Sequence, residues 1–80
     1  MSVAMMPVEG STNIQKIGYD HLQRELHIEF SGGSVYVFTD VPPQLHTGLM
    51  HAKSKGSFFH ANLKGQFQHR KLDQEAKPTA

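Results

Sequence analysis

The chain has 80 residues, no cysteine and a formal net charge of +1. This length suits one small domain, which buries only about 60% of the surface that its unfolded chain exposes. The lack of cysteine excludes a disulfide framework and a thiolate metal site, and it fits either a reducing cytosol or indifference to redox state. No apolar run approaches the roughly 20 residues of a membrane-spanning helix. We therefore expect a cytoplasmic protein without a membrane partner.

The two ends of the chain are expected to be disordered. Residues 1–10 hold a short apolar segment that lacks the positive charge and the length of a signal peptide. Residues 73–80 have no apolar period. A single ordered domain is thus expected over residues 11–72.

Three segments of the first half have the pattern of β-strands. Residues 14–19 contain β-branched and aromatic side chains, residues 26–30 alternate strictly between apolar and polar, and residues 35–39 carry two aromatics. Gly32 and Gly33 separate the last two segments and permit the positive φ angles of a tight hairpin. The pattern predicts a three-stranded antiparallel meander.

The length of this hairpin loop decides where Tyr36 and Phe38 point. A two-residue loop pairs Ile28 with Val37 and sends both rings to the polar face of the middle strand. A three-residue loop, with Gly33 in a left-handed conformation, pairs Ile28 with Tyr36 and directs both rings to the core. We favour the three-residue loop, because a small domain needs its largest apolar groups in the core.

The chain from Pro43 onward has helical periodicity. Pro43 ends the third strand and suits the first turn of a helix, where its missing N–H costs nothing. Leu45 and Leu49 recur at helical spacing, which predicts a first helix over residues 43–53. Gly48 either weakens this helix or allows a close approach to the sheet.

A second helix is expected to follow with Ser57 as its N-cap. Phe59, Leu63 and Phe67 then fall on one helical face. Residues 68–72 form a short extended segment that can return to the sheet edge. The predicted fold class is α+β, a three-stranded antiparallel meander followed by two helices packed on one face.

Four short motifs occur in a characteristic order: IGYD at residues 17–20, YVF at 36–38, VPP at 41–43 and SKGSFF at 54–59. In this order they resemble the KTSC domain over about residues 11–72. That module is named for its occurrence at the C-terminus of some lysyl-tRNA synthetases, and it is also found as a small free-standing protein of bacteria and phages. The family has no established activity, and its association with a synthetase suggests RNA binding.

Two positions depart from the family's usual pattern. Phe38 stands where the family usually has a second tyrosine, so a role that requires this hydroxyl does not carry over. His60 stands where an asparagine usually follows the paired aromatics of the second helix.

Positive charge is concentrated in the second half of the chain. Residues 1–40 hold two basic and five acidic side chains, whereas residues 41–72 hold five lysines or arginines and no carboxylate. The five cations are Lys53, Lys55, Lys64, Arg70 and Lys71. Such a segment attracts phosphate backbones, although five cations over this length are also an ordinary solvated surface. We expect the backbone N–H groups of Ser57, Phe58 and Phe59 to add an anion site.

Aromatic side chains offer a second means of contact with nucleic acid. Rings on a sheet stack on bases in RNA-recognition modules. Most rings of so small a domain are needed in its core. The first candidates for stacking on a base are therefore only Tyr36 and one of Phe58 or Phe59.

Neither a metal site nor an active site is predicted. The six histidines are scattered, and His46 and His51 are five residues apart on diverging faces of the first helix. No nucleophile, glycine-rich phosphate loop or pair of carboxylates accompanies them. We therefore expect no enzyme activity, no metal and no cofactor.

Two functions agree with these observations. The first is a non-catalytic nucleic-acid-binding accessory module for RNA, which uses the five cations together with Tyr36 and Ser57. The alternative is a protein-interaction or self-association module, such as a homodimer, that uses the open sheet face or a sheet edge. The two-residue hairpin loop would favour the alternative, because it exposes Tyr36 and Phe38.

Overall fold

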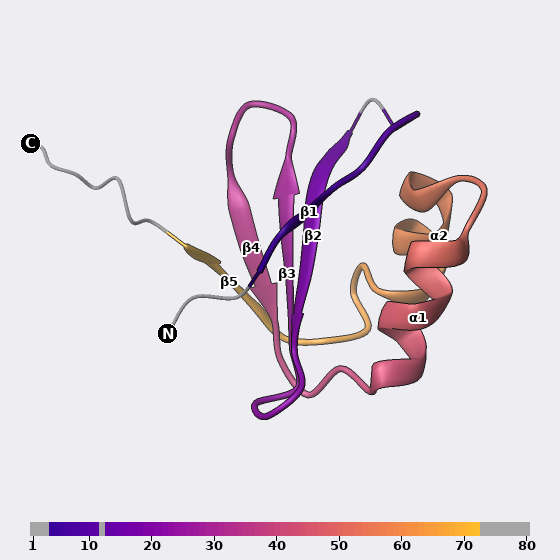
Figure 1. The fold of residues 1–80 in the computed structure, drawn as a ribbon. Helices are drawn as coiled ribbons and strands as arrows, with labels where there is room; N and C mark the ends of the chain where they lie inside the picture. The colour runs from indigo at the N-terminus through magenta and orange to yellow at the C-terminus, as the bar shows by residue number, and fades with distance from the viewer. Residues whose placement is uncertain (1–3, 12, 73–80) are drawn as a thin grey trace, which may run out of the picture.

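The computed structural model describes residues 4–11 and 13–72 and has a five-stranded antiparallel sheet with two helices on one face (Figure 1). The strands are β1 (Met6–Pro7), β2 (Ile14–Asp20), β3 (Glu25–Phe30), β4 (Val35–Phe38) and β5 (His69–Leu72), and they lie in this order across the sheet. The helices are α1 (Pro43–His51) and α2 (Lys55–Asn62). The α+β class is confirmed, and the predicted meander forms the middle of a larger sheet.

The outer strands β1 and β5 correct the prediction of three strands. β1 pairs with β2, Met6 opposite Ile17, within the ten residues for which no order was expected. β5 pairs with β4, Tyr36 opposite Lys71, and is the expected return of the chain to the sheet edge. A two-residue strand that contains proline has no periodicity to detect, which explains why β1 was missed. The predicted disordered tail lies outside the described residues.

The β3–β4 hairpin has the three-residue loop. Ile28 pairs with Tyr36 and Leu26 with Phe38, and Gly33 has a φ angle of 93°. The rings of Tyr36 and Phe38 therefore point toward the helices. Phe38 is 3% exposed, whereas Tyr36 is half-buried at the edge of the core.

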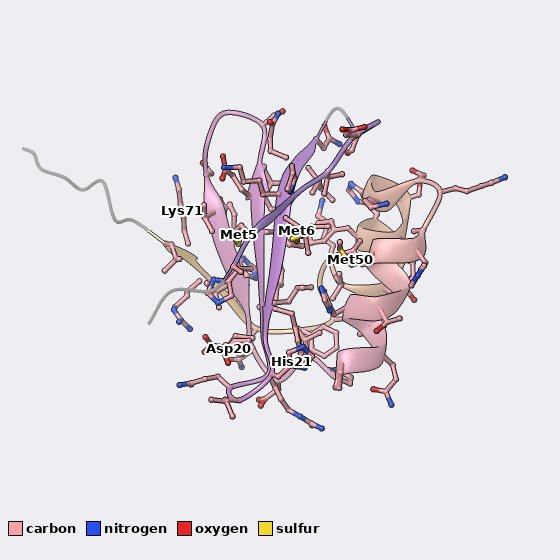
Figure 2. All side chains as sticks on the ribbon, viewed as in Figure 1. Met5, Met6, Asp20, His21, Met50 and Lys71 are labelled. Atoms are coloured by element: carbon pink, nitrogen blue, oxygen red, sulfur yellow. The ribbon has the colours of Figure 1, made fainter. Side chains whose placement is uncertain are left out.

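The core lies between the sheet and the two helices. Ile17, Leu26 and Ile28 of the sheet, Leu49 of α1 and Leu63 after α2 are fully buried within it. Met50 projects from α1 toward the same core (Figure 2).

Aromatic contacts anchor α2 to the sheet. The Phe59 ring meets the rings of Phe30 and Phe38 edge to face, with a centroid separation of 5.4 Å in each pair. These contacts fix the position of α2 over β3 and β4.

Gly48 allows a close contact between the two helices. A Cβ atom at this position would lie 2.8 Å from Cζ of Phe58. The glycine thus makes room for the ring of a residue on α2, and the close approach is to the other helix rather than to the sheet.

Candidate nucleic-acid interface

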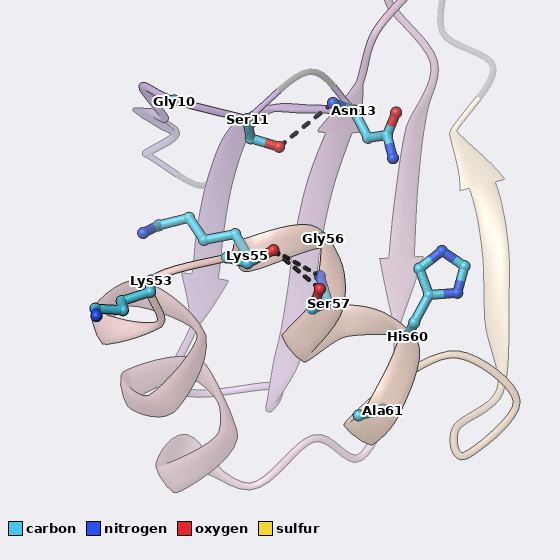
Figure 3. A pocket seen from close by; sticks show the side chains of 10 residues that line it. Gly10, Ser11, Asn13, Lys53, Lys55, Gly56, Ser57, His60 and Ala61 are labelled. Atoms are coloured by element: carbon cyan, nitrogen blue, oxygen red, sulfur yellow. Dashed lines mark hydrogen bonds between the residues drawn. The ribbon is translucent and has the colours of Figure 1, made fainter.

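A polar cleft of about 600 Å³ lies where α2 begins. Ser11 and Asn13 line it from the connection between β1 and β2, and Lys53, Lys55 and His60 line it from α2 and the residues before α2 (Figure 3). Lys53 and Lys55 extend from the same end of the cleft, and His60 lies at the other end (Figure 3). The cleft therefore combines two ammonium groups with polar side chains.

The first turn of α2 differs from the prediction, because Ser54 rather than Ser57 is the N-cap. Ser54 Oγ accepts a hydrogen bond from the Ser57 N–H at 3.2 Å, and the Phe58 N–H donates to the Ser54 carbonyl at 3.0 Å. These two N–H groups are already bonded and cannot form the anion site expected of them. Both serines fit an N-cap pattern, and spacing alone does not choose between them.

Lys55 has a structural role as well as a place in the cleft. Its Nζ donates a hydrogen bond of 3.1 Å to the carbonyl of Ala52, the C-cap of α1. A cation at a helix C-terminus satisfies an unpaired carbonyl and complements the helix dipole. Lys53 is exposed beside it.

A second hollow, of about 250 Å³, continues from the cleft along α2. It shares Asn13, Gly56 and His60 with the cleft. It extends as far as Phe30 and Lys64. The two hollows are thus adjacent, with three lining residues in common.

A third hollow, of about 270 Å³, is lined mainly by rings, and we call it the aromatic hollow. Its lining residues are Phe30, Tyr36, Phe38, Phe59, Lys64, Gly65 and His69. It shares Phe30, Phe59 and Lys64 with the second hollow. The cleft, the second hollow and the aromatic hollow lie one after another beside α2, from Lys53 before the helix to His69 of β5. We call the three together the α2 groove.

The structure brings five of the seven candidate residues to this groove. Lys53, Lys55 and Ser57 line the cleft, Lys64 lines the other two hollows, and Tyr36 lines the aromatic hollow. The described residues that line the groove include no carboxylate. The groove is therefore a cationic surface that ends in aromatic rings.

Arg70 and Lys71 lie elsewhere on β5. Arg70 pairs with Val37, whose side chain points away from the helices because it alternates with Tyr36 and Phe38. The Nη1 atom of Arg70 lies 3.5 Å from Oε2 of Glu25. Lys71 is exposed on the edge strand opposite Tyr36 and is not among the residues that line the groove.

His60 and His69 are groove residues that the sequence analysis did not name as candidate binding residues. His60 links the cleft to the second hollow, and the His69 ring lies 5.8 Å from that of Tyr36 and 5.3 Å from that of Phe38. The sequence held one indication for His69. It belongs to the segment that was expected to return to the sheet edge, and a strand there would lie beside the one that carries both aromatics.

Two histidines that are far apart in the sequence meet at the far end of the sheet from the β3–β4 loop. His46 of α1 stacks on Tyr19 with ring centroids 5.0 Å apart, and the His21 ring lies 6.4 Å from His46. The Tyr19 hydroxyl donates to the Val41 carbonyl. Burial lowers the pKa of His46 below its ordinary value of 6.5, and the nearby His21 lowers it further.

We expect the protein to lose stability as the pH falls below about 6.5. Burial also lowers the pKa of His27, against the opposing effect of Glu25. Because both folded-state pKa values are depressed, the unfolded chain binds protons first as the pH falls. The contribution of these two histidines to stability is thus fully present above about pH 6.5, and it is lost as the pH falls toward their folded-state pKa values.

Urea unfolding at about pH 7.5 and about pH 5.5 measures this loss. His46→Gln should reduce the difference between the two free energies of unfolding. The matched control is His51→Gln, at an exposed position of the same helix, which should leave the difference unchanged. A wild-type protein that is equally stable at both pH values would contradict the expectation.

Two further observations concern metals and membranes. Among the residues that the structure describes, no three His, Asp or Glu side chains form a group that could hold a metal ion. Over the same residues, neither helix has the length and apolar character needed to cross a bilayer.

Comparison with known proteins places the chain in a family. A family model described as the KTSC domain matches residues 10–67. The crystal structure of a KTSC domain protein from Yersinia pestis is similar with a TM-score of 0.83 and 40% identity, over 90% of this chain and 100% of that chain.

Two further relatives are similar in sequence. A protein of Tsukamurella paurometabola is 41% identical over 54 residues, which are 68% of this chain and 79% of that protein. A lysine–tRNA ligase of Nostoc punctiforme is 40% identical over 55 residues, which are 69% of this chain but only 10% of the ligase. From the family model and the solved structure together, the chain belongs to the KTSC domain family.

Proposed function

We propose that this chain is a non-catalytic accessory module that binds RNA along the α2 groove. The observation that carries the proposal is the composition of the groove. Lys53, Lys55 and Lys64 line it, and no carboxylate occurs among its described lining residues. A polyanion is the ligand whose charge complements such a surface.

The mechanism follows from the kind of contact that these side chains make. Lysine ammonium groups attract phosphates and displace condensed counterions, so the affinity falls as salt is added. Contacts to phosphate position a ligand without reading its bases. We therefore expect binding with little sequence preference.

The choice of RNA rests on a relative. The ligase of Nostoc punctiforme that this chain resembles is named for tRNA, and the chain matches a tenth of its length. A small module within such an enzyme would increase the enzyme's affinity for RNA by adding contacts to phosphates. A cytoplasmic location agrees with this function and with the absence of cysteine.

The alternative of a protein-interaction module, on the open sheet face or a sheet edge, loses one feature that would have favoured it. Its expected signature was an exposed pair of rings, Tyr36 and Phe38, on the open face of the sheet. The three-residue hairpin register turns both rings toward the helices instead. The other surface expected of it, a sheet edge, lies at β1 and β5. No observation on the described residues identifies a protein partner there.

The test is fluorescence anisotropy of labelled oligonucleotides and tRNA, titrated with the full chain at 50 mM and 200 mM salt. We expect dissociation constants of about 1–100 µM at the lower salt, with weaker binding at the higher salt. An absence of binding at 50 mM salt would refute the proposed function. Binding that does not respond to salt would refute its mechanism.

A further inference from the structure

We propose that the aromatic hollow receives one unpaired base of a single-stranded RNA, so that the α2 groove prefers single strands to duplexes. This inference rests on the proposed function and specifies its substrate class. It depends on the rings at the end of the groove, whereas the proposed function depends on the lysines.

The rings of the hollow form a floor and a rim. Phe38 and Phe59 are 3% and 9% exposed and form the floor. Tyr36 is half-buried and His69 is exposed, and both line the hollow. Their ring centroids are 5.8 Å apart with planes tilted by 57°, which leaves the two rings as adjoining walls rather than a closed stack.

The size of the hollow favours a single ring system. Its volume of about 270 Å³ lies just below the roughly 300–1,000 Å³ that is typical of sites for drug-sized ligands. Aromatic side chains stack on any base, because every base has a π face. A base that enters the hollow would meet Tyr36 and His69 above the floor.

A charged neighbour distinguishes this hollow from an ordinary gap in an apolar surface. Lys64 lines both the aromatic hollow and the second hollow. A base in the aromatic hollow therefore has an ammonium group beside it for an adjacent phosphate, and the next phosphates can follow the groove toward Lys53. This charge pattern suits a nucleic acid better than an apolar peptide.

The same geometry discriminates against duplexes. Paired bases are stacked inside the helix, and only the backbone of a duplex could contact the lysines. A duplex would therefore gain the phosphate contacts but not the contact with the rings, whereas a single strand can place an unstacked base in the hollow.

The experiment uses a labelled strand of about ten positions that is abasic throughout, and the same strand with one central 2-aminopurine. The two strands carry the same charge and differ by one base. We expect the base to increase the affinity of the full chain about tenfold, and its fluorescence to be quenched on binding. The protein has no tryptophan, so its own emission does not obscure the signal.

Variants at the rim connect the effect to the hollow. Tyr36→Ser should abolish the advantage of the base, and Tyr36→Phe should retain it because the ring remains. His69→Ala, at an exposed position, is a second variant in case Tyr36→Ser does not fold, and it should reduce the advantage. His51→Ala, on the exposed side of α1, is the matched control and should leave it unchanged.

The outcomes separate the two proposals. In one outcome, both strands and a duplex bind with equal, salt-sensitive affinity, and Tyr36→Ser has no effect. This outcome would overturn the aromatic hollow as a base site and leave the proposed function standing. An absence of binding by every strand at 50 mM salt would overturn both. Equal competition by an acidic peptide that carries one phenylalanine would also overturn the assignment to a nucleic acid base.

Discussion

Replacing Lys53 and Lys64 together by glutamate is expected to weaken RNA binding about 50-fold at 50 mM salt. Each phosphate contact to a single strand contributes about 0.7 to the slope of log affinity against log salt. The double variant should therefore also have a slope that is shallower by about 1.4. Both lysines are exposed, so the substitutions should not disturb the core. Anisotropy titrations over a range of salt concentrations measure both quantities.

The matched control is the double variant Lys16→Glu and Arg24→Glu. It changes the net charge by the same amount, and both positions are exposed and outside the α2 groove. Its affinity should decrease far less, through the net charge alone. Equal losses in the two double variants would show that the overall charge, and not the groove, governs binding. Lys55 is left unchanged because its ammonium group also bonds to the end of α1.

Phe59→Ala is expected to lower the free energy of unfolding by about 3–5 kcal/mol. The ring is buried and meets Phe30 and Phe38 edge to face, so its removal would leave a cavity between α2 and the sheet. Small domains have a total stability near the lower end of about 5–15 kcal/mol. We therefore expect a substantial unfolded population at 25 °C. Urea unfolding followed by circular dichroism is the suitable measurement, because the chain has no tryptophan.

Two substitutions calibrate this result. Phe59→Leu fills much of the space and should cost less than about 1.5 kcal/mol. Leu22→Ala changes a side chain that is 96% exposed in the β2–β3 turn and should alter stability by less than about 0.5 kcal/mol. If Phe59→Ala proved as stable as Leu22→Ala, the ring would not be what holds α2 on the sheet.

The features that the sequence predicted well are those with a strong local cause. The strict alternation in residues 26–30 and the adjacent glycines define β3 and its hairpin, because each residue's face follows from a period of two. Pro43 places the start of α1 in the same way. Local chemistry was thus sufficient for the middle of the sheet and for the first helix.

The features that the sequence missed depend on contacts between distant segments. β1 forms because β2 offers it an edge, and the contact between His21 and His46 exists because the end of β2 meets α1. Arg70 was grouped with the lysines by its charge, but the alternation along β5 turns it to the other face of the sheet. Charge density along the chain therefore located the groove only approximately, since it carries no information on which face a strand residue occupies.

The hairpin loop also determines how this sequence can change during evolution. Its two glycines have φ angles of 95° and 93°, which other residues rarely adopt, although no neighbouring atom would contact a side chain there. The number of loop residues, however, decides which face of the sheet carries Tyr36 and Phe38. Loss of one codon in this loop would move both rings out of the core and the groove at once. We therefore expect lineages of this domain to keep the two glycines for their backbone conformation and the loop length for the face that the two rings occupy.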